Sequence, residues 1–185
     1  SMNLGMGVFK SIDGGKTWVH MGLEATKTIH SISIDPTNPN IVYVGAMGDP
    51  FTANEHRGLY KTVDGGKTWK RTLFVSDETG ISEVLMDPKN PQILYASAHQ
   101  RRRHEWTYIG GGPESALYKS TDGGETWRLI NDGLPRGEMG RIGLAIAPSD
   151  AQWIYAIVEA RYGKGGVFLS TNQGETWSKQ SSFST

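Results

Sequence analysis

The strongest constraint on the fold of this chain is an octet that occurs four times. It reads SIDGGKTW, TVDGGKTW, STDGGETW and STNQGETW, beginning at Ser11, Thr62, Ser120 and Ser170. The third positions of successive octets are 51, 58 and 50 residues apart. Regular self-similarity of this kind indicates a repeat architecture, and a period near 50 residues suits the four-stranded blade of a β-propeller.

The segments around each octet have strand character. GVFKS, GLYKT, ALYKS or GVFLS precedes the octet, and two further segments rich in β-branched and aromatic residues lie upstream of the last three. In two repeats these upstream segments are joined by DPTNP or DPKNP, in which Pro and Asn favour a tight turn. One repeat therefore reads strand A, turn, strand B, loop, strand C, octet, strand D. Successive hairpins favour an antiparallel meander.

The predicted fold class is all-β, a β-propeller fragment with fourteen strands and no helix. We expect a half blade at 7–22 and blades at about 28–74, 80–131 and 141–181. Closed propellers have about 4–8 blades, so three and a half blades predict a segment of a longer chain. The leading Ser-Met resembles a cloning remnant.

An incomplete ring leaves an unpaired strand edge at one end and an open side face at the other. We expect Phe168 and Trp177 to lie exposed on that open face, with no next blade to cover them. Exposed surfaces of this kind usually mark an interface. The sequence therefore predicts a homo-oligomer, most simply a dimer, that completes the propeller.

The octet itself is predicted to be structural. Asp or Asn accepts backbone N–H groups in a tight turn, Gly tolerates positive φ, Ser and Thr hydroxyls add hydrogen bonds, and Trp fills space between blades. Four copies at equivalent places in four blades cannot line one site. The predicted structural residues are Asp13, Gly15, Trp18, Asp64, Gly66, Trp69, Asp122, Gly124, Trp127, Asn172, Gly174 and Trp177.

The pattern Ser/Thr-x-Asp-x-Gly-x-Thr-Trp resembles the Asp-box, or bacterial neuraminidase (BNR) repeat. Asp-boxes occur in sialidases, xyloglucanase-type glycoside hydrolases, sortilin-type sorting receptors and photosystem II assembly factors. Through YVGAMGDPFTANEHRGLYKTVDGGKTW and QRRRHEW followed by GGGPESALYKSTDGGETW, the chain is most similar to bacterial sortilin-like, BNR-repeat "glycosyl hydrolase" proteins. The resemblance implies a propeller whose boxes face away from the ligand site, and an extracellular or periplasmic location. It implies no particular activity.

Composition excludes several function classes. Lys plus Arg and Asp plus Glu number 19 each, so no net charge attracts nucleic acid or an anionic membrane. The absence of cysteine removes disulfides, thiolate metal sites and cysteine nucleophiles. No apolar run approaches the roughly 20 residues that span a bilayer, and the H-E-x-x-H metal motif is absent. We expect no nucleic-acid partner, no membrane insertion, no metal and no cofactor.

The loops between strands B and C differ greatly and are the predicted binding region, because variable loops on a regular scaffold usually carry function. They are DPFTANEHR at 49–57, HQRRRHEWTYIGGGPES at 99–115 and RYGKG at 161–165. Arginine forks bind carboxylate or phosphate, and aromatic rings stack on sugars. Alternatively, the arginines pair with nearby carboxylates and the aromatic residues pack between blades. The candidate ligand-binding residues are Arg101, Arg102, Arg103, His104, Glu105, Trp106, Tyr108, Asp49, His56 and Arg141.

The predicted function is a non-catalytic propeller segment that binds a protein or a glycan. The alternative is part of a sialidase-like or xyloglucanase-like glycoside hydrolase whose active site needs further blades. Most glycosidases require two carboxylates at a fixed separation. The sequence does not pair the carboxylates of the loops, so no catalytic residue is assigned. These carboxylates are Asp49, Glu55, Asp77, Glu78, Glu105 and Glu138.

Overall fold

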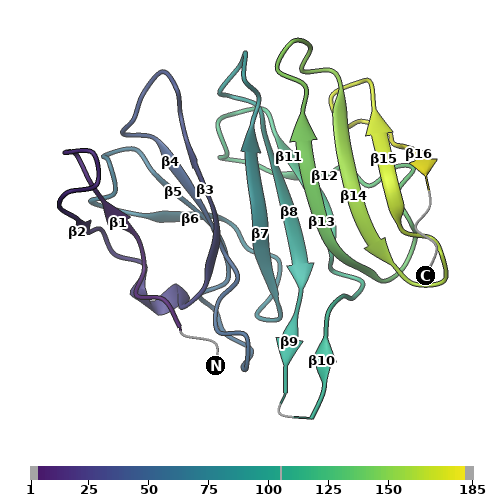
Figure 1. The fold of residues 1–185 in the computed structure, drawn as a ribbon, viewed down its shortest axis with the longest axis horizontal. Coiled ribbons are helices and arrows are strands. Elements are labelled where there is room, and N and C mark those ends of the chain that lie inside the picture. The colour runs from purple at the N-terminus through teal and green to yellow at the C-terminus, as the bar shows by residue number, and fades with distance from the viewer. Residues whose placement is uncertain (1–3, 105, 182–185) are drawn as a thin grey trace.

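The computed structural model describes residues 4–104 and 106–181, and its main feature is a row of three four-stranded antiparallel sheets (Figure 1). Each sheet is a meander in which consecutive strands pair as neighbours, apart from one inserted hairpin. The first contains β3 (Ile29–Ile34), β4 (Val42–Ala46), β5 (Gly58–Thr62) and β6 (Lys70–Leu73). The second contains β7 (Thr79–Met86), β8 (Leu94–Gln100), β11 (Ala116–Ser120) and β12 (Arg128–Leu129). The third contains β13 (Met139–Ile146), β14 (Ile154–Ala160), β15 (Gly166–Ser170) and β16 (Ser178–Ser181).

Two short hairpins and one helical turn complete the described part of the chain. β1 (Phe9–Lys10) pairs with β2 (Val19–His20), and a 3₁₀ turn, η1, follows at Glu24–Thr26. β9 (Arg102–Arg103) and β10 (Tyr108–Ile109) form a hairpin inserted between β8 and β11. The all-β prediction is confirmed, but fourteen strands was too few and the turn η1 was not expected. The polar sequence RRRHEWTYIG has no strand alternation, and its pairing depends on the loop folding back on itself.

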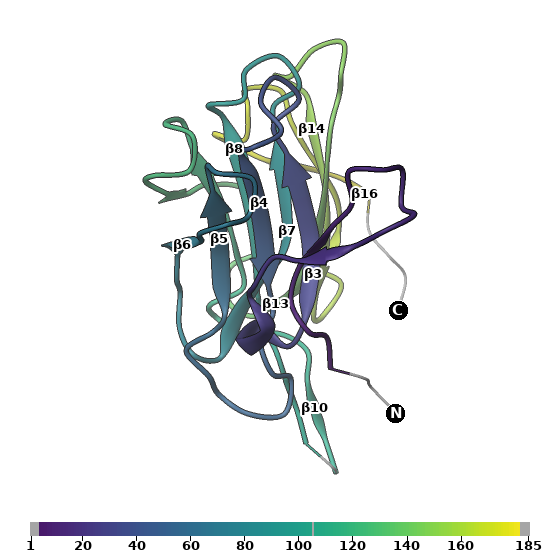
Figure 2. The same ribbon diagram turned by 90° about the vertical axis from the view of Figure 1, so that its left-hand side faces the viewer.

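The first strands of the three sheets, β3, β7 and β13, lie next to one another along one side of the molecule (Figures 1 and 2). Side-chain hydrogen bonds tie them together. The Val84 N–H donates to Ser31 Oγ at 3.1 Å, and the Leu144 N–H donates to Glu83 Oε2 at 2.9 Å. These strands therefore form a continuous inner surface, as the innermost strands of a propeller do.

Apolar side chains fill the two interfaces between sheets. Tyr43, Leu59 and Ile81 belong to the cluster between the first and second sheets. Tyr95 and Ile142 belong to the cluster between the second and third. All five are at most 2% exposed. Burial of this area is the main stabilising contribution, at about 25 cal/mol per Å² of apolar surface.

The box tryptophan packs toward the preceding sheet. Trp177 is 5% exposed, and its Nε1–H donates to the carbonyl of Ile130 at 2.8 Å. Phe168 is 2% exposed in the same cluster. The expectation that Trp177 and Phe168 lie exposed was wrong. Both rings pack against the sheet that precedes their blade, so they need no following blade to cover them. Trp18, in the first box, is 62% exposed.

Each box closes its own turn by one repeated set of hydrogen bonds. In the second box, Asp64 Oδ1 accepts from the Thr62 hydroxyl at 2.7 Å and from the Thr68 N–H at 2.9 Å. Oδ2 of Asp64 accepts from the Thr68 hydroxyl, and Thr62 Oγ1 accepts the Gly66 N–H. The threonine hydroxyl and N–H of this turn hold the pKa of Asp64 well below its usual range. In the first box, Thr17 lowers the pKa of Asp13 to about 2.

The fourth box keeps this geometry with an amide. Asn172 Oδ1 accepts from the Ser170 hydroxyl and the Thr176 N–H, and its Nδ2 donates to Thr176 Oγ1 at 2.9 Å. Gln173 takes φ 57°, the left-handed conformation that Gly adopts in the other boxes. The amide therefore replaces the carboxylate without loss of the turn.

Candidate functional site

The two ends of the sheets differ in how well their polar groups are satisfied. At one end, the boxes meet the A–B turns through backbone bonds, for example Gly65 N–H to the carbonyl of Asn40 at 3.0 Å. At the other end lie the B–C loops and the β9–β10 hairpin. Within residues 4–104 and 106–181, four of the five buried side-chain atoms without a hydrogen-bond partner are in these loops. They are Asn54 Oδ1, Arg57 Nε, Arg101 Nε and Arg102 Nε.

Buried polar atoms in native structures are usually bonded, so this concentration needs a cause. The loop end, unlike the box end, has hydrogen-bonding capacity that its own residues leave unused. An end of that kind is suited to binding a polar ligand.

Arg57 organises the loop end. It is 0% exposed. One terminal nitrogen donates to the carbonyls of Glu78 and Arg101, at 3.0 and 3.1 Å, and the other donates to those of Asp49 and Thr52, at 2.9 and 3.2 Å. Burial lowers the pKa of Arg57. One side chain thus ties the 49–57 loop to the segments before β7 and after β8.

The three adjacent arginines have three different environments. Arg102 forms an ion pair with Glu78, as the alternative interpretation of this loop anticipated. Arg103 is exposed, and its N–H donates to the carbonyl of Pro50 at 2.7 Å. The guanidinium carbon of Arg101 lies 5.4 Å from the ring centroid of Tyr108. Of the three, only Arg101 combines partial burial with the absence of an ion pair within the described residues.

Aromatic side chains are exposed on the β9–β10 hairpin, which projects from the sheets in Figure 1. Trp106 is 81% exposed and Tyr108 is 54% exposed. The His104 ring stacks on Trp106, with centroids 5.5 Å apart and planes 17° apart. Glu105 lies outside the described residues. Rings held in this way present flat apolar faces to a ligand.

Asp49 and His56 have local roles in the 49–57 loop. Asp49 Oδ1 accepts the Phe51 N–H at 2.9 Å, which closes a turn. His56 is exposed, and its carbonyl accepts from the Tyr60 hydroxyl at 3.0 Å. Neither residue lines the pockets described below.

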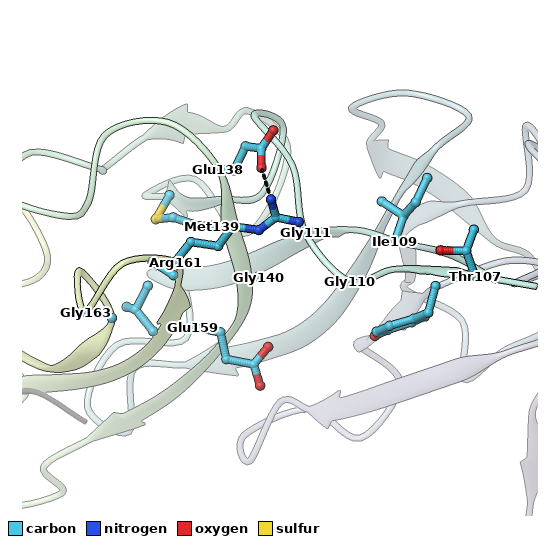
Figure 3. Close-up of a pocket in the computed structure, with 14 residues that line it drawn as sticks. Thr107, Ile109, Gly110, Gly111, Glu138, Met139, Gly140, Glu159, Arg161 and Gly163 are labelled. Carbon is cyan, nitrogen blue, oxygen red and sulfur yellow. Dashed lines mark ion pairs between the residues drawn. The ribbon is translucent and has the colours of Figure 1, made fainter. Parts of the chain in front are cut away.

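A pocket of about 740 Å³ lies between the β10 segment and the start of the third sheet (Figure 3). Residues Thr107–Gly111 form one wall, and the ends of β13 and β14 form the other. The Gly112 N–H donates to the carbonyl of Met139 at 3.0 Å, and a Cβ on Gly111 would lie 2.6 Å from the same oxygen. The glycine run therefore lets two backbones touch beneath the pocket.

Charged groups of both signs line this pocket. Glu138 Oε2 lies 4.0 Å from Arg161 Nη1, and both side chains are exposed (Figure 3). Glu159, also in the wall, accepts the backbone N–H of Arg141 at 3.1 Å. Sequence analysis named Glu138 and Arg141 but missed Glu159. Glu159 follows Tyr155 and Ile157 at alternate positions on the exposed side of β14, a placement that the mostly apolar sequence IYAIVEA does not reveal.

Within 4–104 and 106–181, no group of three or more His, Asp or Glu side chains could hold a metal ion. No helix in that part of the chain is long and apolar enough to cross a membrane.

Two family models match the sequence. The model for "Sortilin, neurotensin receptor 3" (Sortilin-Vps10) matches residues 7–141, and the BNR/Asp-box repeat model matches residues 168–179. Xyloglucanase Xgh74A of Acetivibrio thermocellus is 33% identical over 157 residues, which cover 78% of this chain and 18% of the relative. Vacuolar protein sorting/targeting protein 10 of Eremothecium gossypii is 28% identical over 117 residues, which cover 61% of this chain and 7% of the relative.

Solved structures with the same fold include two GH74 proteins. The GH74 xyloglucanase from Xanthomonas campestris has a TM-score of 0.72 at 18% identity, covering 97% of this chain and 27% of that one. An ancestral GH74 enzyme has a TM-score of 0.73 at 20% identity, covering 95% and 21%. The chain therefore has the fold of a segment of these proteins. It spans less than a fifth of the curated relatives' length.

Proposed function

Since this chain belongs to the Sortilin-Vps10 family, we propose that it is a non-catalytic, ligand-binding segment of a β-propeller, with its site at the loop end. The observation that carries the proposal is the pocket of about 740 Å³ beside the β9–β10 hairpin. The exposed ring of Tyr108 lines one side of it, and carboxylates and a guanidinium line the other. The boxes, whose polar groups are used within their own turns, serve as the scaffold.

The ligand that best suits this pocket is a glycan. Tyr108 offers a flat face for a sugar ring, while Glu138, Glu159 and Arg161 offer acceptors and donors for hydroxyl groups. Several relatives are named as xyloglucanases, which favours a carbohydrate ligand. A protein ligand is the other possibility, favoured by the family and by the relative named as a sorting protein.

Calorimetric titration of the chain with a panel of oligosaccharides that includes xyloglucan fragments tests the proposal. We expect Trp106→Ala and Tyr108→Ala each to weaken binding about fivefold, since a lost aromatic contact is worth roughly 1 kcal/mol. Trp18→Ala is the matched control, because Trp18 is 62% exposed and lies outside the pocket. The assignment would be overturned if neither Trp106→Ala nor Tyr108→Ala weakened binding, or if the chain bound no glycan.

The rival function is glycoside hydrolysis, favoured by the presence of Glu138 and Glu159 in one pocket. Retaining glycosidases hold two carboxyl groups about 5–5.5 Å apart and inverting ones about 6.5–9.5 Å apart. We expect no turnover, because both carboxylates are exposed, Glu138 faces Arg161, and Glu159 accepts a backbone N–H. Turnover of aryl glycosides that disappears in both Glu138→Gln and Glu159→Gln would establish the rival instead.

We propose in addition that a second copy of the chain covers the open side face of the third sheet. Tyr155 and Ile157 on β14 are 45% and 51% exposed, and Trp153 beside them is 42% exposed. Large exposed apolar side chains in one place favour an interface. Light scattering at micromolar concentration is expected to give a dimer, and Ile157→Glu a monomer. A monomeric parent chain would contradict this.

A further inference from the structure

A second, smaller pocket of about 170 Å³ lies where the inner strand β3 meets the loop end. It is lined by Leu4, Thr28, His30, Met47, Pro50, Arg57 and Arg101. Arg57 and Arg101 are positively charged, and His30 becomes positively charged when its ring is protonated. None of the lining residues carries a carboxylate. The lining comes from the segment before β1, from the first sheet with its 49–57 loop, and from the segment after β8, so the fold assembles it from distant parts of the chain.

Arg57 gives this pocket a buried positive charge. Its terminal nitrogens donate to four backbone carbonyls, and among residues 4–104 and 106–181 it has no ion pair and its Nε has no partner. The loop closes over Arg57 at Gly48, which has φ 73°. A Cβ there would lie 2.5 Å from Arg57 Cγ. The backbone at position 48 therefore leaves room for the buried Arg57 side chain because Gly48 has no Cβ.

Arg101 supplies a second guanidinium, and its capacity for hydrogen bonds and ion pairs is unused within the described residues. Its Nε is buried without a partner, and its side chain makes no ion pair within the described residues. Among the acidic side chains of the loop end, Glu78 pairs with Arg102, and Asp49 Oδ1 accepts the Phe51 N–H. A buried charge is costly unless it is paired and hydrogen-bonded.

We propose that this pocket binds a small oxyanion: a sulfate, a phosphate or a carboxylate group. Arg101 and His30 would donate to its oxygens, and the buried charge of Arg57 would stabilise it. Charge-assisted bonds from guanidinium to such oxygens are about twice as strong as neutral ones. The pocket is distinct from the larger one proposed for a glycan, and its occupant is either a free ion or an acidic group on a larger ligand.

The surroundings of His30 give the site a pH dependence. The His30 side chain is exposed at the pocket, but partial desolvation of its ring lowers its pKa, and the positive charges of Arg101 and Arg141 and the neighbouring His99 lower it further. Without an anion, the imidazole is therefore neutral at pH 7. A bound oxyanion favours the protonated imidazole and raises that pKa, so the binding of sulfate, whose own charge does not change in this range, should tighten as pH falls below 7.

The test is titration with sodium sulfate, sodium phosphate and sodium acetate at constant ionic strength, followed by NMR of the His30 ring and by calorimetry. We expect saturable binding with a rise in the His30 pKa. Arg101→Gln should weaken binding at least about tenfold, and His30→Gln should remove the pH dependence. Arg103→Gln, which removes the same charge from an exposed position outside the pocket, should leave both unchanged.

The side chain of Arg101 makes no hydrogen bond within the described residues, so its replacement should not unfold the chain, and circular dichroism verifies this. Non-saturable shifts, equal in Arg101→Gln and Arg103→Gln, would mean charge screening only and would overturn the site. Tight binding of inorganic ions indicates a free ion as occupant. Weak ion binding that Arg101→Gln abolishes indicates an acidic group on a larger ligand. Because the probes are simple ions, either result leaves the glycan proposal untouched.

Discussion

The box end and the loop end of the sheets use the same kinds of polar residue in opposite ways. In the boxes, a carboxylate, two hydroxyls and several N–H groups form a closed set within eight residues, repeated from Asp13 to Asn172. At the loop end, Arg57 donates a hydrogen bond to the carbonyl of Arg101, which lies 44 positions later in the sequence. Three arginines at this end have a buried Nε without a partner among the described residues.

This difference separates stability from recognition. A locally closed hydrogen-bond set can be copied from blade to blade, because nothing in it depends on the neighbouring loops. A hydrogen-bond network that spans several loops depends on the sequences of all of them and is not repeated in the other blades. The polar atoms that this network leaves without a partner are available to a ligand. Changes at the box end should therefore alter the free energy of unfolding, and changes at the loop end should alter binding or loop order.

The largest expected effect is at the box end. It tests whether a box tryptophan stabilises the fold by packing against the preceding sheet. Trp177→Ala should lower the free energy of unfolding by about 3–5 kcal/mol, because a buried ring and its bond to the carbonyl of Ile130 are lost. Trp18→Ala should change it by less than about 0.5 kcal/mol, because that ring is 62% exposed. Urea denaturation measures both, and similar values would refute the idea that the ring depends on the preceding sheet.

The next effect is at the loop end. Arg57→Met should lower the free energy of local opening at the loop end by about 2–4 kcal/mol, because four carbonyls lose their donor in a buried place. Hydrogen exchange should show the 49–57 loop and the segment after β8 opening while the box turns stay protected. Arg136→Met, at an exposed position whose side chain makes no hydrogen bond or ion pair within the described residues, is the control. Uniform loss of protection at both ends would contradict a local role for Arg57.

The repeat itself made most of the fold predictable. The octet spacing and the strand patterns around it were enough to predict an all-β propeller with turns and boxes at one end, because those features depend on local sequence. The β9–β10 hairpin and the burial of Trp177 were not predictable in this way. Both depend on which distant segment a residue meets, and strand periodicity carries no information about that.

The candidate site was predictable only as a region. The assignment of the long loop at 99–115 to the binding region stays a prediction, and the structure separates its arginines into one ion-paired, one exposed and one partly buried residue. Arg57 and His30 were not singled out, because an arginine in a polar loop and a histidine in a strand look ordinary until tertiary contacts bury or surround them. Glu159 was hidden for a similar reason, near the end of a mostly apolar strand.

The smallest expected effect tests whether the box needs a charge. Asp122→Asn should change stability little at pH 7, because Asn172 shows that an amide can accept from the same hydroxyl and N–H and donate to the threonine Oγ1. The effect should appear in acid. The Thr126 hydroxyl, the Thr126 N–H and the Ser120 hydroxyl hold the pKa of Asp122 well below its usual value.

A folded-state pKa below the unfolded one, near 3.9, makes the carboxylate stabilising above about pH 4. That stabilisation is lost as pH falls toward the folded-state pKa. Asp122→Asn should therefore lose less stability than the parent chain between pH 4 and pH 2. The difference should be partial, because Asp13 and Asp64 still titrate in the variant. Thermal unfolding across this range measures it. An identical acid dependence in both proteins would mean that the hydrogen bonds, and not the charge, account for the whole contribution of Asp122.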